Sequence, residues 1–238
     1  MIKFFFLGRR APGLTRQAAQ AHLRKVHGRM VVLPPPDAGA LPAYYVQNHV
    51  VDGGYPAGDG PHAIERDLVT EVNFESMPAM QAALATPYYL ETLSPDEPRF
   101  VHNPSVVRLN LAPHTIVEGA RTSAKLFVFV SRTPDLDDDR WTAIRDGIAE
   151  TMRGWDGIAA LTENVVAPPP HGQRFADSVF EAWFDGHAAA MAAASQVSAL
   201  FNADGIDRDR SLTIVAEEFT EERLRALLAE TTAEQGRS

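Results

Sequence analysis

The two halves of the sequence repeat the same order of motifs, and this repeat limits the chain to folds built from two similar units. Residues 3–14, KFFFLGRRAPGL, correspond to residues 125–136, KLFVFVSRTPDL, with an apolar run, an Arg-x-Pro turn and a leucine in the same order. Three more pairs follow in order: 45–51 with 160–167, 69–76 with 179–186, and 105–111 with 211–217. An internal repeat of this kind indicates two copies of one folding unit. We therefore predict one unit at residues 1–115, a second, degenerate unit at 122–231, and a flexible tail at 232–238.

The histidines are distributed unequally between the two copies. Six of the eight lie in the first copy, at positions 22, 27, 49, 62, 102 and 114. The sequence pairing places Asn164 of the second copy opposite His49 of the first. This loss of ionisable groups from one side suggests that the first half kept a chemistry and the second half kept a shape.

Composition narrows the classes of function. The chain is 45% hydrophobic and 22% charged, which is typical of a soluble globular protein. Its net charge of -9 disfavours nucleic acids and anionic membrane surfaces as partners. The absence of cysteine excludes disulfides, thiolate catalysis and iron-sulfur clusters. No stretch approaches the roughly 20 apolar residues of a membrane span, and the apolar start is too short for a signal peptide, so we expect a cytoplasmic protein.

The order of the predicted elements indicates an α+β fold. The apolar run 2–8 is typical of a buried strand, and Thr15 is a candidate N-cap for a helix that Pro34 ends. Further strands are expected at 44–51, 68–75 and 106–111, with a helix after Ser76. Each half thus runs strand, helix, strand, strand, helix, strand, the ferredoxin-like βαββαβ unit. Two such sheets can cover each other's open face by closing into a barrel with helices outside.

Strand alternation predicts which side chains face the lumen of this barrel. On the second strand, Tyr45, Gln47 and His49 share one face. On the third strand, Glu71 and Asn73 share a face that mixes polar and apolar groups. We predict that both sets line one pocket, although a slip of one residue would invert this assignment.

Two histidines and a carboxylate are the candidate proton-transferring groups. His27 lies near the end of the first helix, and histidine titrates nearest neutral pH. Its structural alternative is a solvated helix-end histidine stabilised by the helix dipole. His49 could equally be a strand histidine held by hydrogen bonds. Glu71, matched by Glu181 in the second copy, could belong to a structural ion pair.

The sequence contains no signal for a metal or a nucleotide cofactor. His22 and His27 are five residues apart, about 140° around an α-helix, so they are poorly placed to share a metal ion. Glycine-rich phosphate loops are also absent, and we expect no cofactor. Aromatic residues supply surface for an apolar ligand. The predicted substrate contacts are Tyr45, Gln47, Asn73, His22, Tyr88 and Trp183.

Four motifs of the first copy resemble an EthD domain of the dimeric α/β-barrel superfamily. They are residues 9–31, 45–51, 71–84 and 85–89. The sequence departs from the usual pattern at Ala19, where the family commonly has a large aromatic residue, and at Leu23, commonly tryptophan. The resemblance implies a half-barrel that pairs with a second one, here in the same chain. It also implies chemistry at an activated carbon acid held in an apolar barrel, without choosing the reaction.

The leading hypothesis is a cofactor-independent lyase, isomerase or cyclase that acts on a small aromatic or polyketide-like substrate. In this hypothesis His27 is the general base or acid, His49 is its partner or a donor to a carbonyl, and Glu71 orients an imidazole. One alternative is a cofactor-free monooxygenase of the same fold, and another is a protein that binds an apolar metabolite without converting it. A homodimer is possible through the outer faces.

Overall fold

The structure is a computed structural model that describes residues 1–169 and 171–235. The elements of the first half are β1 (Ile2–Gly8), α1 (Arg16–His22), α2 (Gly28–Val32), β2 (Tyr44–Gly54), β3 (Leu68–Phe74), α3 (Met77–Leu84), α4 (Ser94–Asp96) and β4 (Val107–Val117). Those of the second half are β5 (Ala124–Val130), α5 (Asp138–Arg153), β6 (Ile158–Val166), β7 (Ser178–Phe184), α6 (His187–Ala194), α7 (Val197–Leu200), β8 (Leu212–Thr220) and α8 (Glu221–Gln235). Two π-helical turns are Leu23–His27 and Tyr89–Leu93. Single 3-10 turns occur at Glu97–Arg99, Asn103–Ser105 and Arg208–Arg210.

The strands follow one another in the hydrogen-bonded order β1-β3-β2-β8-β5-β7-β6-β4, which closes as a barrel. The chain divides into two compact units: unit 1 contains 1–49, 66–108 and 219–238, and unit 2 contains 50–65 and 109–218. The boundaries at 115 and 122 that the repeat predicts stay a prediction. The end of the predicted tail, 236–238, lies outside the described residues.

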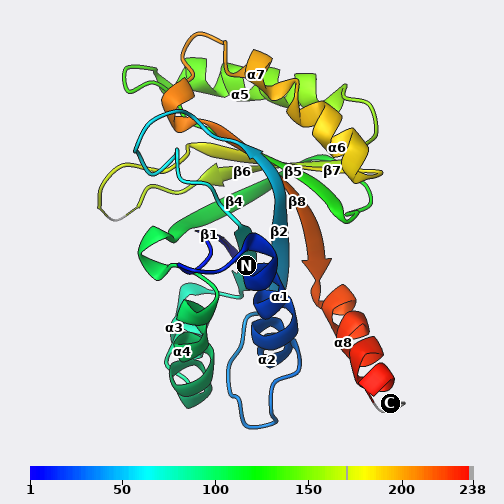
Figure 1. The fold of residues 1–238 in the computed structure, drawn as a ribbon. Helices are drawn as coiled ribbons and strands as arrows, with labels where there is room; N and C mark the ends of the chain where they lie inside the picture. Colours follow the sequence, from blue (N-terminus) through cyan, green and yellow to red (C-terminus); the bar gives the residue numbers. More distant parts are fainter. Residues whose placement is uncertain (170, 236–238) are drawn as a thin grey trace. The chain divides into compact units, whose positions relative to one another are not determined.

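Each unit has its own helical layer and its own core. In unit 2, α5, α6 and α7 lie over one face of the sheet formed by β5, β6 and β7 (Figure 1). Trp141, Ile148 and Met152 of α5 enter the core beneath them. In unit 1, β3 pairs antiparallel with both β1 and β2, and Phe4, Tyr45 and Val72 pack on the face that bears the helices.

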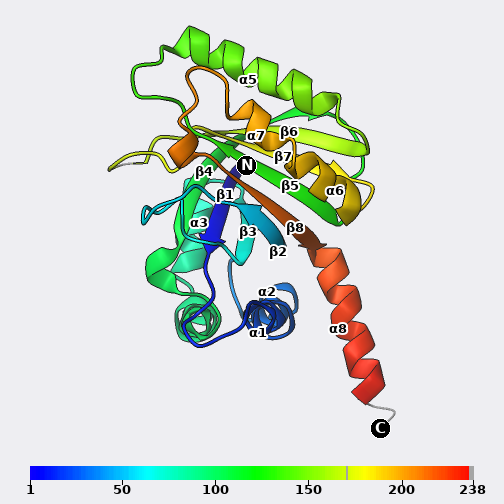
Figure 2. The ribbon, with the colours of Figure 1, turned by 45° about the horizontal axis from the view of Figure 1, so that its top comes forward.

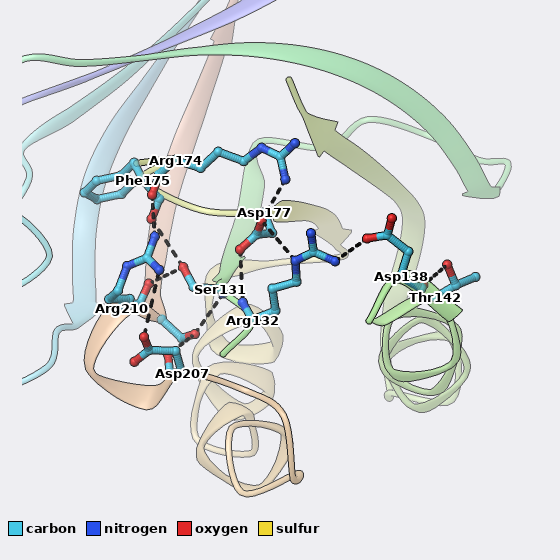
Figure 3. A network of polar contacts seen from close by, with 10 residues as sticks. Ser131, Arg132, Asp138, Thr142, Arg174, Phe175, Asp177, Asp207 and Arg210 are labelled. Carbon is cyan, nitrogen blue, oxygen red and sulfur yellow. Dashed lines mark hydrogen bonds and ion pairs between the residues drawn. The ribbon is translucent and has the colours of Figure 1, made fainter. Parts of the chain in front are cut away.

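The turns of the two halves use the same hydrogen bonds. Asp67 precedes β3 and accepts hydrogen bonds from the backbone N–H and the guanidinium of Arg10, both at 2.7 Å. Asp177 precedes β7 and accepts from the backbone N–H of Arg132 and from Arg174, both at 3.0 Å (Figure 3). Further along, the N–H of Ala11 donates to the carbonyl of Phe100 as that of Thr133 does to Gly205.

The strand register corrects one detail of the sequence pairing. Asn48 lies opposite Val69 and donates to its carbonyl at 2.9 Å. Asn164 lies opposite Val179 and donates to its carbonyl at 3.1 Å. Asn164 therefore corresponds to Asn48, one residue before His49. The sequence pairing of Asn164 with His49 was therefore wrong by one position, and Val165 stands where the first half has His49.

The first helix begins as predicted but changes its phase midway. Thr15 is the N-cap, and its hydroxyl accepts from the N–H of Ala18 at 3.1 Å. In the π turn, the N–H of Gly28 reaches back five residues to the carbonyl of Leu23. The extra residue per turn moves the buried stripe, so that Val26 is 42% exposed and His27 is buried. In an uninterrupted α-helix, Val26 would share the buried face of Ala19 and Leu23.

The side chain of Gln47 holds this π turn against the sheet. Its amide N–H group donates to the carbonyl of Leu23 at 2.9 Å. This approach requires a glycine at position 28, because a Cβ there would collide with Nε2 of Gln47 and would lie 2.9 Å from the Leu23 carbonyl oxygen. The π turn, the glycine and the glutamine therefore depend on one another.

We expect Gly28→Ala to destabilise the protein by about 1–3 kcal/mol, because the methyl group must displace the Gln47 amide or the helix. The matched control is Gly147→Ala in α5, where no atom lies within 4 Å of the added Cβ and alanine is the better helix former. Urea denaturation of both variants measures the difference. Equal stability of the two variants would show that the contact at Gly28 relaxes without cost.

Candidate active site

Unit 1 contains a cavity of about 350 Å³ between its helices and the helix-bearing face of β1, β2 and β3. Apolar side chains from all of these elements make up most of its wall. The exceptions with ionisable groups are His27, Tyr45, Tyr89, Glu97 and Arg108. An apolar cavity with a few converging polar groups is the usual form of a small-molecule site.

The segment from α1 to α2 and the segment around α4 lie side by side in unit 1 (Figure 2), and one carboxylate joins them. Asp96 of α4 is buried, and its Oδ2 lies 3.1 Å from Nδ1 of His27. Its Oδ1 lies 2.9 Å from Nε2 of His22. The π turn brings both rings to Asp96, so the 140° separation expected from an α-helix is wrong for this pair. Both rings also contact Phe100, His22 by stacking at 5.5 Å and His27 at 4.9 Å.

The contact with Asp96 determines the tautomer of neutral His27. A carboxylate can only accept, so the ring donates through Nδ1–H and its lone pair lies on Nε2. Within the described part of the chain, Nε2 makes no hydrogen bond. An imidazole oriented by a carboxylate and open to a cavity through its other nitrogen can accept a proton there.

Adjacent carboxyl groups of this segment have opposite shifts of pKa. Burial alone would raise the pKa of Asp96, but hydrogen bonds from His27 and His22 outweigh burial and hold that pKa below its usual value. Burial raises the pKa of Glu97 above its usual value, although His27, Tyr89 and Arg108 act in the other direction. Carboxyl groups whose pKa values are driven apart are typical of sites that need both a carboxylate and an acid.

A second chain of hydrogen bonds ends at the hydroxyl of Tyr45. The Leu23 carbonyl can only accept, so the atom of Gln47 that contacts it must be the NH₂ group. The same group donates to the Tyr45 hydroxyl at 3.0 Å, which leaves the phenolic hydrogen available to a ligand. Burial raises the pKa of Tyr45, so the phenol keeps this hydrogen.

His49 holds the side-chain amide of Gln47 through a hydrogen bond. Its Nε2 lies 2.9 Å from Oε1 of Gln47, an acceptor, so Nε2 carries the hydrogen. Burial, together with the nearby charges of Arg24 and Arg223, lowers the pKa of His49 to about 3. His49 is therefore neutral at physiological pH, and it packs on Phe219 rather than on the cavity wall.

The structure separates Glu71 from these residues. Glu71 lies opposite Val46, on the other face of the sheet from Tyr45, Gln47 and His49, so the predicted common face is wrong for β2. On that other face Glu71 is 3.5 Å from Lys3, as Glu181 is 2.5 Å from Lys125 in unit 2. These contacts favour the structural ion pair over a role in proton transfer.

The remaining predicted contacts are spread over several places. Asn73 shares the face of Glu71. Tyr88 donates its hydroxyl to the carbonyl of Met30 at 2.9 Å and does not line the cavity, whereas its neighbour Tyr89 does. Trp183 belongs to unit 2, where its indole N–H donates to Glu218 at 3.1 Å.

Sequence reasoning missed Asp96, Glu97, Tyr89 and Arg108. The first two lie in SPDEPRF (94–100), where two prolines indicate a turn and give no helical period. Nothing in this turn-rich segment indicates that it contacts a helix about 70 residues earlier in the chain. Arg108 lies on β4, where alternation alone would place it on an exposed face.

No group of three or more His, Asp or Glu residues is arranged to hold a metal ion within 1–169 and 171–235. Over the same residues, no helix is both long and apolar enough to cross a membrane.

Similar solved structures define the class of fold. An anthrone oxidase-like protein matches with 13% identity and a TM-score of 0.55, over 92% of this chain and 93% of that chain. A candidate monooxygenase from Fusobacterium nucleatum subsp. nucleatum has 8% identity, a TM-score of 0.52 and 91% coverage of both chains. A candidate chlorite dismutase has 12% identity and a TM-score of 0.53, over 95% of this chain and 99% of that chain. The chain shares the dimeric α/β-barrel fold of these proteins.

The family model of the EthD domain matches residues 11–104. The chain therefore carries an EthD domain over this segment, and the resemblance inferred from the sequence motifs is confirmed. The matched segment includes His22, His27, Tyr45, Asp96 and Glu97. Comparison with curated proteins found no match.

We expect the variant His49→Gln to lose less stability in acid than the wild type. With a folded pKa of about 3 against about 6.5 in the unfolded chain, His49 takes up its proton mainly on unfolding between these values. Its contribution to the free energy of unfolding therefore falls as the pH decreases below 6.5, by about 1.4 kcal/mol per pH unit. Denaturant titrations from pH 7 to pH 4 measure the difference.

Gln at position 49 keeps an N–H donor for Gln47 and removes only the titration. His114→Gln, at an exposed position on β4, is the control and should follow the wild type. An acid dependence of His49→Gln that equals that of the wild type would contradict the assigned pKa.

Proposed function

We propose that the cavity of unit 1 binds a small aromatic carbon acid and that His27 removes a proton from carbon without a cofactor. The observation that carries this proposal is the buried His27–Asp96 contact, which leaves Nε2 as the basic atom of a histidine that lines a mainly apolar cavity. An apolar wall suits an aromatic ring, and a carboxylate behind the imidazole stabilises the imidazolium that forms.

The other groups of the cavity have complementary roles in this proposal. Loss of a proton from a carbon next to a carbonyl places negative charge on the carbonyl oxygen. The phenolic hydrogen of Tyr45, freed by the bond from Gln47, can donate to that oxygen. Glu97, whose raised pKa favours the protonated acid, can return a proton to the product. His49 then acts as a positioning residue rather than as the partner of His27.

We also propose that the chain is a fused pair of ferredoxin-like repeats in which only the first binds substrate. The matching turns at Asp67 and Asp177 and the shared order of elements support the duplication. Assembly into a homodimer and a cytoplasmic location remain predictions from the sequence.

Anthrone is a suitable probe. It appears in the name of one similar structure, and its methylene group is acidic because it is conjugated with a carbonyl. Under argon in D₂O, the wild type should accelerate exchange of the methylene hydrogens, followed by NMR. His27→Gln should lower the enzyme-dependent rate by about 10² to 10⁴-fold. Asp96→Asn should lower it in the same direction, because an amide can bind the wrong tautomer of His27. His114→Gln is the control, and full activity of a folded His27→Gln variant would refute the assignment.

A cofactor-free monooxygenase is the second candidate, and the names of the similar structures favour it. It begins with the same proton transfer, after which the carbanion reduces dissolved oxygen. With anthrone, one O₂ is consumed and anthraquinone and water are formed. We expect oxygen uptake in air that stops with His27→Gln, measured with an oxygen electrode. Exchange in D₂O without oxygen uptake would instead support the lyase, isomerase or cyclase.

A further inference from the structure

Arg108 places a positive charge at the wall of a mainly apolar cavity. It is the second residue of β4 and lines the cavity together with Phe6 of β1. Its guanidinium lies over the Phe6 ring, 5.1 Å from the ring centroid. This contact orients the planar guanidinium while the side chain stays exposed, so its N–H groups remain accessible from solvent.

No carboxylate within the described residues forms an ion pair with Arg108, in contrast to other arginines of unit 1. Arg10 and Arg16 both contact Asp67, at 2.7 and 3.0 Å, and Arg99 lies 3.8 Å from Asp96. Arg108 forms no ion pair with Glu97 within the described residues. Its charge acts to lower the pKa of Glu97, but burial raises that pKa more strongly and so favours the neutral acid. The cavity wall therefore carries a cation that its neighbours do not neutralise.

We propose that Arg108 binds an anionic oxygen group of the ligand, so that the cavity selects aromatic compounds that carry a carboxylate or a similar anion. The apolar wall takes the ring, and the guanidinium takes the anion through one or two charge-assisted hydrogen bonds. This selection deepens the proposed function by naming the substrate class, and it rests on the same cavity.

The anchor also gives the ligand one orientation. His27 and Arg108 come from different elements, the π turn and β4, and both line the cavity. A ring held at its anionic end cannot turn freely, so one edge is presented to the remaining polar groups. Orientation of this kind lowers the entropy cost of reaching the reactive geometry.

The experiment compares two ligands of nearly equal shape, 2-naphthoate and neutral 2-naphthamide, by calorimetric titration. The wild type should bind the naphthoate about 10-fold or more tightly than the amide, which corresponds to about 1.4 kcal/mol. Arg108→Gln should abolish this preference and leave the affinity for the amide within about twofold. Arg108→Lys should keep part of it, because the charge remains but the planar fork is lost. Higher salt should reduce the preference of the wild type.

Arg153→Gln is the control, because Arg153 is an exposed arginine of α5 in unit 2. It should leave both affinities unchanged. The naphthoate should also displace bound naphthamide, as expected for one shared cavity. Simultaneous binding of both ligands, or a preference that survives in Arg108→Gln, would overturn the proposal.

The readouts for the two proposals are separate. Methylene exchange with anthrone, a neutral probe, tests His27 and does not depend on an anion. Preference for naphthoate tests Arg108 and requires no turnover. Exchange without the preference leaves the proposed function intact and refutes the anchor, whereas the preference without exchange supports the anchor and refutes proton transfer by His27.

Discussion

The amide of Gln47 is the interaction on which the candidate site depends. One NH₂ group holds the Leu23 carbonyl of the π turn and the hydroxyl of Tyr45, while the amide oxygen accepts from His49. The turn determines where His27 lies, and the bond to Tyr45 decides which way the phenol can donate. A single buried side chain thus couples the positions of a potential base and a potential donor.

Much of the fold could be predicted from the sequence, because strands and caps have local signals. The apolar run of β1 and the N-cap at Thr15 are both confirmed. The π turn could not be predicted, since it depends on Gln47, which lies 24 residues beyond the carbonyl that it holds. An α-helical period consequently separated His22 from His27, although both contact Asp96. The error on β2 has another cause, because alternation defines two faces but does not say which one the helices cover.

Of the candidate site, only the histidines could be predicted from the sequence. His27 was found from its chemistry and its helix, whereas Asp96 has no period and no motif of its own. Its contact with His27 spans 69 positions, so only tertiary packing brings them together. Glu71 shows the opposite failure. A buried carboxylate looks functional in the sequence, yet Lys3 and the corresponding pair Lys125–Glu181 account for it by charge neutralisation.

The asymmetry between the halves has a physical explanation in the turns that they share. The matching bonds from Ala11 to Phe100 and from Thr133 to Gly205 make Gly205 the counterpart of Phe100. Where Phe100 stacks on His22, a Cβ on Gly205 would lie 2.9 Å from the tip of Ile144, which packs against the core of unit 2. An aromatic ring at position 205 would not fit beside that isoleucine. In the second half an aliphatic side chain therefore lies beside Gly205, whereas in the first half an imidazole stacks on the ring of Phe100. The uninterrupted α-helix of α5 needs no glycine and glutamine to hold a π turn, and the second half can keep the architecture without the groups to which proton transfer is ascribed in the proposal.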